Sequence, residues 1–467
     1  MIFRDSDKDT IAAIATACGE GGVGIVRVSG KEAIAVADRM FEARSGVPAR
    51  DQKSFTARYG HVVSRKPSQG SADVVDEALL LVMRAPKSFT AEDTAEFQVH
   101  GGTVVLQEVL ALAVREGARL ALPGEFTKRA FLNGRIDLLQ AEATLDLIQA
   151  KTETTRRWAS AQLDGVLSKK IGDLKGSLLE ALSHLEASID FPEDDLSPAD
   201  FSSLEKKLSS LESVLGDLLG GSALGLLAKR GMRVALWGRP NTGKSSLMNR
   251  LVRHNRVIVT PVPGTTRDVV EEEIQIEGFP VRLFDTAGIQ ETNDVIEKEG
   301  VARSRKAVTG ADLVLFVVDA SVPLKPEDEI LFREIEMLSK IFVLNKSDLP
   351  KKIDVSKWVP GQTKIVETSC ETGEGIPSLE KGIFEWAIQG KAGTAGESVV
   401  SSVRQKDVLE KMAAALRAAR EACAERRSPE LIAVDVRLAL EQLGILVGEI
   451  FTDDLLDVLF SRFCIGK

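Results

Sequence analysis

The sequence predicts a multidomain α/β protein, and three observations support that prediction. Residues 238–245 match the phosphate-binding pattern G-x-x-x-x-G-K-[ST] between an apolar segment and a helix-like segment. Leucine and isoleucine recur at three- and four-residue spacing between about residues 133 and 230, as in helices with one buried face. Residues 1–132 mix short strands with helical segments. We therefore expect an N-terminal α+β domain, a helical bundle domain and an inserted P-loop α/β domain.

Composition limits the class of protein. The 467 residues fit about three domains, and 44% hydrophobic and 28% charged residues are ordinary for soluble globular proteins. No run approaches the ~20 apolar residues that cross a bilayer, and the N-terminus lacks a signal-peptide layout, so we expect a cytoplasmic protein that uses no membrane. A net charge of −9 means that nucleic acid would bind through local basic patches or a partner. The widely spaced cysteines indicate a reducing compartment: Cys18, Cys370, Cys423 and Cys464.

Residues 1–132 are expected to form the α+β domain. Residues 22–30 alternate between apolar and polar side chains, and residues 76–83 are a second strand-like run. An amphipathic helix is expected after His100 and two glycines. A histidine in this setting is more often a core or capping residue than a catalyst.

Residues 133–231 and 389–467 are expected to form the two parts of the helical domain. A proline-containing break at residues 191–195 separates two helices, and we expect the second helix to end at Gly220-Gly221. A flexible linker at residues 390–398 precedes renewed helical spacing. Helical segments on both sides predict one bundle into which residues 232–388 are inserted. The two apolar stripes before the insertion are Leu167, Ile171, Leu174, Leu178, Leu182, Leu185 and Ile189, and Leu204, Leu208, Leu211, Leu215 and Leu218; the stripe after it begins Val408, Met412, Leu416.

The phosphate-binding loop follows the strand-like residues 234–237 and precedes the helix-like residues 246–251. Its glycines allow backbone N–H groups to surround phosphate oxygens at a helix N-terminus. We expect Lys244 to reach the β- and γ-phosphates and the Ser245 hydroxyl to bind Mg²⁺.

Three further motifs follow in the order found in GTP-binding domains. Thr266 offers a second hydroxyl for Mg²⁺, and Asp285–Gly288 has the form D-x-x-G. Asn345–Asp348 has the form N-K-x-D, in which the Asp348 carboxylate accepts from the N–H and amino groups of guanine. Adenine has no such donor pair, so these motifs predict a Ras-like P-loop GTPase domain that uses GTP.

Two positions depart from the usual GTPase pattern. Residues 368–371 read Thr-Ser-Cys-Glu where Ser-Ala-Lys is usual, so the lysine contact with the base is missing. Ile289 stands where Ras-type proteins place a glutamine that orients the attacking water. An acidic side chain nearby would have to orient the water instead, and the residues alone do not choose among Glu291, Asp294, Glu297 and Glu299. The complete GTP-binding set that we expect is Asn241, Thr242, Gly243, Lys244, Ser245, Ser246, Thr260, Pro261, Val262, Pro263, Gly264, Thr265, Thr266, Asp285, Thr286, Ala287, Gly288, Asn345, Lys346, Ser347, Asp348, Ser369, Cys370 and Glu371.

Segments along nearly the whole chain resemble the MnmE (TrmE) family of tRNA-modification GTPases. Other GTPases lack this combination of motifs. The resemblance rests on residues 9–13, 24–30, 89–93, 123–134 and 137–143, and on the terminal Cys464-Ile465-Gly466-Lys467.

The resemblance implies a homodimer formed through folate-binding N-terminal domains, which bind 5-formyl- or 5,10-methylene-tetrahydrofolate. It also implies an FAD-dependent partner of the MnmG type, in a heterotetramer or larger complex. Together they would add an aminomethyl or carboxymethylaminomethyl group to C5 of the wobble uridine of certain tRNAs. The folate contacts implied by the motif match are Arg27, Glu96, Arg135 and Lys467, of which Arg135 stands where relatives often carry lysine.

The resemblance further implies that two GTPase domains associate around K⁺, which replaces an arginine finger. Glu297 would orient water and Lys244 would stabilise the transferring phosphoryl group. Cys464 is a candidate catalytic thiolate, although a lone cysteine is more often an inert apolar residue. The implied K⁺ ligands are Asn241, Thr260, Val262 and Thr265.

Two other functions use the same nucleotide motifs. A regulatory RNA-binding GTPase of ribosome assembly would carry an appended basic module, and a mechanochemical membrane GTPase would carry an anchor. This chain has an acidic helical frame and no evident anchor, so tRNA modification is the favoured interpretation.

Overall fold

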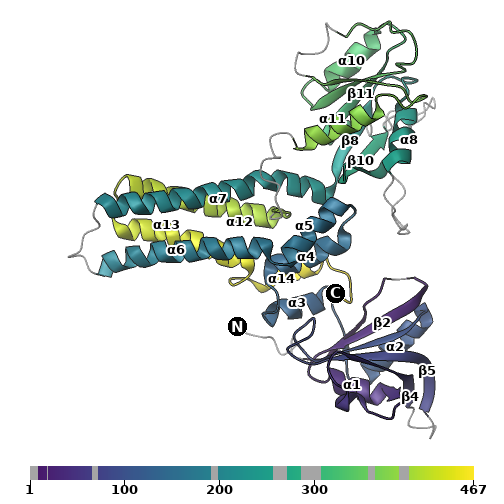
Figure 1. The fold of residues 1–467 in the computed structure, drawn as a ribbon, viewed down its shortest axis with the longest axis vertical. Helices are drawn as coiled ribbons and strands as arrows, with labels where there is room; N and C mark the ends of the chain where they lie inside the picture. The colour runs from purple at the N-terminus through teal and green to yellow at the C-terminus, as the bar shows by residue number, and fades with distance from the viewer. Residues whose placement is uncertain are drawn as a thin grey trace. The chain divides into compact units, whose positions relative to one another are not determined.

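The structure is a computed structural model, and it describes residues 9–17, 19–65, 72–190, 198–255, 271–285, 305, 307–355, 363–388 and 399–467. The chain forms two compact units (Figure 1). The first consists of Met1–Leu145 with Leu443–Lys467, and the second is Asp146–Gln442. We describe each unit by itself.

The first unit contains a mostly antiparallel sheet in the order β3-β4-β5-β6-β2-β1-β7. Alternate residues of β2 and β5, such as Val26 and Leu80, are fully buried against two helices, which is the period expected of a half-buried strand. The predicted strands at residues 22–30 and 76–83 are confirmed. The elements are β1 (Ile11–Ile14), β2 (Gly21–Ser29), α1 (Ala33–Met40), β3 (Phe41–Ala43), the short 3₁₀ helix η2 (Ala49–Asp51), β4 (Thr56–Arg65), β5 (Ala72–Met83), β6 (Thr94–Gly101), α2 (Thr103–Arg115) and β7 (Arg119–Leu120).

A small helical cluster completes the first unit. Phe131 of α3, Leu138 of α4 and Phe460 of α14 lie in one buried apolar group. The chain end that follows α14 therefore lies beside the segment that follows the N-terminal sheet. The helices are α3 (Glu125–Leu132), α4 (Leu138–Gln149) and α14 (Asp453–Phe460).

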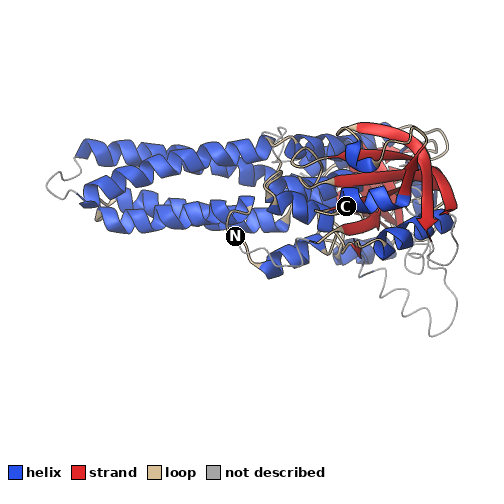
Figure 2. Ribbon diagram, turned by 90° about the horizontal axis from the view of Figure 1, so that it is seen from below, coloured by secondary structure: helices blue, strands red, loops and turns tan. Residues whose placement is uncertain are grey.

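The second unit contains the predicted helical bundle. Glu212 of α7 forms ion pairs with Arg417 and Arg420 of α12, and Arg437 of α13 pairs with Glu186 of α6. Helices from both sides of the inserted segment therefore form one bundle, which confirms that expectation (Figures 1 and 2). The helices are α5 (Glu153–Leu163), α6 (Val166–Asp190), α7 (Pro198–Arg230), α12 (Val403–Ala424) and α13 (Pro429–Val447).

The expected end of the second helix at Gly220-Gly221 is wrong, because α7 continues to Arg230. Leu224, Leu227 and Ala228 of this continuation are buried among the apolar residues of the nucleotide domain. That burial outweighs the low helix propensity of two glycines. The segment Asp200–Arg230 is also long and apolar enough to cross a membrane by length and composition, which we did not expect. Half of its most apolar window is buried inside the protein, however, and the core helix of a soluble protein passes the same test.

The inserted domain has the predicted α/β architecture, with the sheet order β13-β12-β11-β8-β10-β9. All neighbours are parallel except β9, which runs antiparallel to β10. Val234 and Leu236 of β8 face α8 and α11, whereas Ala235 and Trp237 face the α10 side, so the strands are apolar on both faces, as in other covered parallel sheets. The elements are β8 (Met232–Trp237), α8 (Lys244–Asn255), β9 (Glu271–Ile276), β10 (Phe279–Asp285), β11 (Leu313–Asp319), α10 (Pro326–Glu334), β12 (Lys340–Asn345), β13 (Ile365–Thr368) and α11 (Ile376–Ile388).

Candidate functional site

The phosphate-binding loop lies between the end of β8 and the start of α8, and its backbone requires small residues. Gly238 and Gly243 have φ values of +148° and +93°. A Cβ at Gly238 would lie 2.2 Å from the Val317 carbonyl oxygen, and one at Gly243 would lie 2.1 Å from Nδ2 of Asn345. Asn241 also has a positive φ, of +65°, a region that asparagine tolerates better than most residues. The loop is therefore closed tightly against its neighbours.

The side chain of Lys244 folds back over this loop. Its Nζ donates to the carbonyl oxygens of Gly238 at 2.7 Å and Arg239 at 2.6 Å. Burial lowers the pKa of the ammonium to about 8, although the Asp285 carboxylate opposes this effect. A phosphate group would supply the negative charge that this buried cation lacks.

Ser245 and Asp285 bring a hydroxyl and a carboxylate together at the end of the loop. The Ser245 hydroxyl donates to Oδ2 of Asp285 at 2.8 Å, and Asp285 is buried at the end of β10. A hydroxyl beside a carboxylate fits Mg²⁺, which prefers oxygen ligands and keeps several of its waters. Among the described residues, no group of three or more histidine, cysteine, aspartate or glutamate side chains could hold a metal alone.

The base-recognition motif is tied directly to the phosphate loop. Nδ2 of Asn345 donates to the Thr242 carbonyl at 2.9 Å, and Nζ of Lys346 donates to the Asn241 carbonyl at 3.1 Å. Asn345 and Lys346, at the end of β12, therefore hold the backbone of the phosphate loop in place.

Asp348 projects from the turn after β12 and is itself held by a neighbour. The buried Ser369 hydroxyl donates to Oδ1 of Asp348 at 2.6 Å, and the Ser347 N–H donates to the Thr368 carbonyl at 3.1 Å. Asp348 is exposed, so its carboxylate is accessible from solvent. Residues 345–348 and 368–370 thus meet at one end of the sheet.

Cys370 stands at the position that departs from the usual pattern. Its Sγ lies 3.3 Å from Oδ1 of Asn345, and burial raises the pKa of the thiol. Cys370 is therefore a weak donor that supports Asn345 and not a reactive thiolate. Glu371 and Ser246 are exposed nearby.

Several expected site residues lie outside the described residues. They are Thr260, Pro261, Val262, Pro263, Gly264, Thr265, Thr266, Thr286, Ala287, Gly288, Ile289, Glu291, Asp294, Glu297 and Glu299. The linker at residues 390–398, the break at residues 191–195 and Cys18 also lie there. The first member of the expected K⁺ set, Asn241, is described and exposed.

The expected folate residues gather in the first unit. Nε of Arg27 on β2 donates to Oε1 of Glu96 on β6 at 2.7 Å, because these residues are directly paired across the two strands. Arg27 also donates to the Gly466 carbonyl at 3.4 Å, which brings the C-terminal Lys467 to the same place. The guanidinium groups of Arg135 and Arg27 both lie over the Phe89 ring, at 5.1 and 5.7 Å.

The C-terminal segment reaches this place through two close backbone approaches. A Cβ at Gly466 would lie 2.2 Å from the Ile14 carbonyl oxygen, so the segment runs directly against the end of β1. The Gly124 N–H donates to the Cys464 carbonyl at 3.4 Å, and the Cys464 side chain is exposed.

Sequence reasoning missed three supporting residues. Asp319 accepts a hydrogen bond from Lys346 at 2.5 Å, and Phe89 stacks with two arginines. Asp328 of α10 pairs with Arg239 of the phosphate loop at 2.6 Å. Asp328 had a local signal, since it lies in an acidic segment after a proline that is typical of a helix start, and Phe89 begins the segment 89–93 on which the family resemblance rests.

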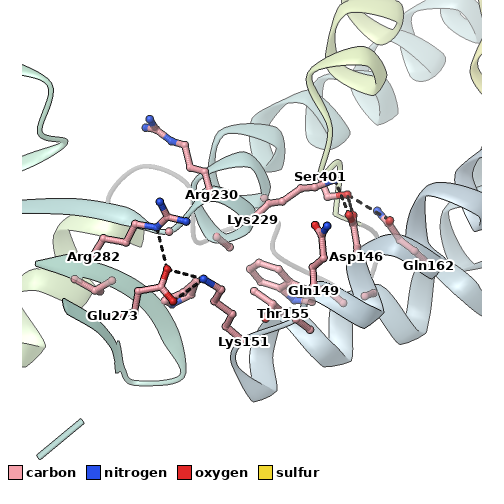
Figure 3. A pocket seen from close by; sticks show the side chains of 18 of the residues that line it. Asp146, Gln149, Lys151, Thr155, Gln162, Lys229, Arg230, Glu273, Arg282 and Ser401 are labelled. Carbon is pink, nitrogen blue, oxygen red and sulfur yellow. Dashed lines mark hydrogen bonds and ion pairs between the residues drawn. The ribbon is translucent and has the colours of Figure 1, made fainter. Parts of the chain in front are cut away.

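An open cleft of about 750 Å³ lies within the second unit, between α5, the end of α7 and the β9–β10 hairpin (Figure 3). Its walls include Trp158, Ile274 and Val281. Charged side chains at its rim neutralise one another: Lys229 with Asp146 at 2.5 Å, and Lys151 with Glu273 at 2.5 Å. None of the expected nucleotide residues that the structure describes lines this cleft.

Two family models match the chain. The model described as GTP-binding protein TrmE N-terminus covers residues 10–135, and the model described as MnmE helical domain covers residues 138–464. Together they cover residues 10–464 except for residues 136 and 137.

Curated relatives match over almost their whole length. A tRNA modification GTPase MnmE from Lysinibacillus sphaericus is 45% identical over 98% of this chain and 99% of its own. The protein of the same name from Symbiobacterium thermophilum is 46% identical over 98% of this chain and 100% of its own, and that from Geobacter sulfurreducens is 44% identical over 98% and 99%.

Solved structures match about a third of the chain. The G domain of the T. maritima FeoB iron transporter is 32% identical, with 33% of this chain and 98% of that chain covered and a TM-score of 0.25. Era in complex with MgGDPNP and nucleotides of 16S ribosomal RNA is 28% identical, with 33% and 57% covered and a TM-score of 0.25.

Proposed function

This chain belongs to the MnmE (TrmE) family of tRNA modification GTPases, and on that basis we propose how it uses GTP hydrolysis to modify tRNA. We propose a K⁺-stimulated GTPase that adds an aminomethyl or carboxymethylaminomethyl group to C5 of the wobble uridine of certain tRNAs. The observation that supports this proposal is the sequence identity of about 45% to curated relatives. This identity extends over nearly the full length of this chain and of each relative, well beyond the nucleotide domain.

The nucleotide site supports GTP hydrolysis through the residues of the phosphate loop and the side chains that surround it. Lys244 would leave the two carbonyl groups that it now contacts and bind the β- and γ-phosphates. Ser245 and Asp285 would hold Mg²⁺, which neutralises charge on the phosphate oxygens when it is bound. Asp348 would accept from the guanine base while Ser369 keeps its carboxylate in place.

The remaining catalytic assignments follow from the family resemblance. Asn241, Thr260, Val262 and Thr265 would bind K⁺, which adds positive charge beside the transferring phosphoryl group. Glu297 would orient the attacking water in place of the glutamine that Ile289 replaces. Thr266 would be the second hydroxyl ligand of Mg²⁺, and Cys464 stays a candidate for a role in uridine chemistry.

The first unit supports binding of a tetrahydrofolate, which would supply the one-carbon unit. Glu96 can accept a pair of donors from a pterin ring, and Arg27, Arg135 and Lys467 suit its carbonyl and carboxylate groups. The Arg27–Glu96 pair is already formed beside the C-terminal segment. We propose that the protein works in the cytoplasm as a homodimer, with an FAD-dependent partner of the MnmG type in a heterotetramer or larger complex.

The experiment that tests this function is mass spectrometry of nucleosides from total tRNA. Cells that lack the gene should lose the modified wobble uridine, and the intact gene should restore it. Rescue with a Lys244→Ala variant should fail because that variant cannot bind the phosphates. An unchanged modification profile in the deletion strain would contradict the proposal, and a defect in ribosome assembly would then favour a regulatory RNA-binding GTPase.

A further inference from the structure

The phosphate loop is held by a largely buried ion pair between Arg239, at a variable position of the phosphate-binding motif, and Asp328, which lies outside the GTPase motifs. Nε of Arg239 donates to Oδ1 of Asp328 at 2.6 Å. The Asp328 side chain is 1% exposed and the Arg239 side chain 15% exposed. Asp328 lies in the first turn of α10, and its other oxygen accepts from the Lys325 N–H at 3.0 Å. One carboxylate therefore caps a helix and holds the loop.

The backbone of Arg239 faces the phosphate side of the same loop. Its carbonyl oxygen accepts from Nζ of Lys244 at 2.6 Å and from Oγ1 of Thr242 at 3.0 Å. Two residues further on, Asn241 has a positive φ, and its carbonyl accepts from Lys346. Asp328 thus fixes Arg239, and the Arg239 carbonyl is one of the two groups that Lys244 contacts in this structure.

A role in stability alone is the simplest alternative for a buried ion pair. Burying two charges costs desolvation, so such a pair is weak support for a fold. The α10 side of the sheet is also held by other contacts: Ile335 just after α10 is fully buried, and Nε1 of Trp237 donates to the Leu331 carbonyl at 3.0 Å. Because these contacts hold α10 without Arg239, the ion pair contributes most to the placement of the loop.

We propose that Arg239 and Asp328 are positioning residues for GTP hydrolysis. By fixing residues 239–242, the pair keeps the loop carbonyls in place when Lys244 moves onto the phosphates, and it sets where Asn241 points. The proposal rests on the GTPase activity of the family, and it does not depend on folate, the partner protein or the tRNA.

The test is steady-state GTP hydrolysis by the purified full-length protein, with nucleotide affinity measured separately. Asp328→Asn keeps an oxygen that can cap α10 but removes the charge, and Arg239→Gln removes the guanidinium. Each variant should lower kcat by about tenfold, since a small misplacement of reacting groups is costly. Its affinity for GTP should change by less than about threefold, because the backbone N–H groups that bind phosphate remain.

Glu329→Gln is the matched control. Glu329 lies next to Asp328 on α10 and pairs with Arg333 at 2.7 Å, but both side chains are exposed. Removing this surface pair should leave kcat, affinity and melting temperature close to wild type.

The double variant Arg239→Gln/Asp328→Asn separates positioning from general damage. If the two residues act as one unit, the double variant should lose no more activity than either single variant. Additive losses would overturn the proposal. So would a kcat within about twofold of wild type in a variant that merely melts at lower temperature, because that is the result of a purely structural pair.

Two further measurements keep the outcome decisive. If Arg239→Gln folds poorly, Arg239→Lys is the alternative variant, because it retains the positive charge. Its kcat should lie between those of Arg239→Gln and wild type. A folded Arg239→Lys protein with no higher kcat than Arg239→Gln would contradict an electrostatic role for the pair. Wild-type protein in the same assay checks the premise, since absence of GTP hydrolysis there would reject the proposed function and not the ion pair.

Discussion

At the scale of single residues, Asp348 is the side chain on which we expect guanine selection to depend. Its carboxylate is held by the Ser369 hydroxyl at 2.6 Å, so its orientation is set before nucleotide binds. In Asp348→Asn, the amide can donate to a carbonyl where guanine has an amino group. We expect the preference for guanine over xanthine nucleotides to fall by about tenfold or more.

A nucleotide competition assay with GTP and XTP measures this change. Glu374→Gln, which alters an exposed carboxylate four residues after Cys370, should keep the wild-type preference. An unchanged preference in Asp348→Asn would mean that Asp348 does not read the base.

Phe89 supports a second residue-scale prediction, in the proposed folate site. Its ring lies under the guanidinium groups of Arg27 and Arg135, and its carbonyl accepts from Arg135 at 2.9 Å. Phe89→Leu removes the cation–π contacts, each worth about 0.5–1 kcal/mol or more, while it keeps an apolar side chain of similar size. Affinity for 5-formyl-tetrahydrofolate should therefore fall by about three- to tenfold.

Isothermal titration calorimetry of the full-length protein measures that affinity. Phe55→Leu is a control on an exposed phenylalanine of the same unit, and it should bind folate as the wild type does. Equal affinities for both variants would show that the arginines do not need the ring.

Some of the candidate site residues could be predicted from the sequence, and others could not. The motifs predict roles for Lys244, Ser245 and Asp348 because a fixed spacing is typical of their chemistry. They could not identify Asp328, which lies 89 residues from Arg239 in the chain, or the stacking on Phe89. Such partners are selected by proximity in the folded state, and no local spacing encodes that proximity.

At the scale of elements, the helix α7 illustrates where local signals fail. Gly220-Gly221 predicted a helix end, but α7 continues because its last turns are buried against the nucleotide domain. The strand β6, which carries Glu96, was also missed, although Ala95, Phe97 and Val99 alternate with polar side chains along it. The strand β8 was predicted correctly because a continuous apolar run precedes a motif of known placement.

The glycines of α7 give an element-scale prediction for stability. A Cβ at Gly225 would lie 2.2 Å from the Val400 carbonyl oxygen, whereas one at Gly216 would meet open space. Gly225 therefore allows residues 399–400 to cross the helix, where Gln162 also donates to the Val399 carbonyl. Gly225→Ala should lower the free energy of unfolding by about 1–3 kcal/mol through this overlap.

Gly216→Ala makes the same chemical change on the same helix and should raise that free energy by up to about 1 kcal/mol, since alanine has the higher helix propensity. Denaturant unfolding followed by circular dichroism compares the two variants. If both shift stability in the same direction, the close approach of residues 399–400 is not what requires glycine at this position.

At the scale of the whole molecule, the chain joins segments that are distant in sequence. Helices before and after the inserted domain form one bundle, and the last residues return to the N-terminal sheet. Periodicity predicted the bundle because the helical segments before and after the inserted domain each carry an apolar stripe that needs another helix to bury it. It could not predict that the C-terminal segment ends beside Arg27, because that placement depends on two backbone approaches, at Gly124 and Gly466, which have no sequence period.

The C-terminal segment therefore allows the two proposed sites to be tested separately. Deleting residues 464–467 removes Lys467, the Gly466 carbonyl that accepts from Arg27, and the Cys464 carbonyl that accepts from Gly124. Affinity for 5-formyl-tetrahydrofolate should fall by about tenfold or more, since a charged partner and a bound backbone segment are both lost. Modification of the wobble uridine should fall with it, while GTP hydrolysis should stay within about twofold of wild type because the nucleotide residues are untouched.

Gly466→Ala provides a milder form of the same test. Its φ of +93° and its contact with the Ile14 carbonyl disfavour any Cβ, so the segment should detach while Cys464 and Lys467 are still present. If this variant loses folate affinity as the deletion does, placement of the segment is what matters. If Gly466→Ala keeps folate affinity and only the deletion loses it, the Lys467 side chain binds folate even when the segment does not pack against the end of β1. A matching loss of GTP hydrolysis in either variant would show that the nucleotide site depends on the C-terminal segment, and the two activities could then not be assigned to separate sites.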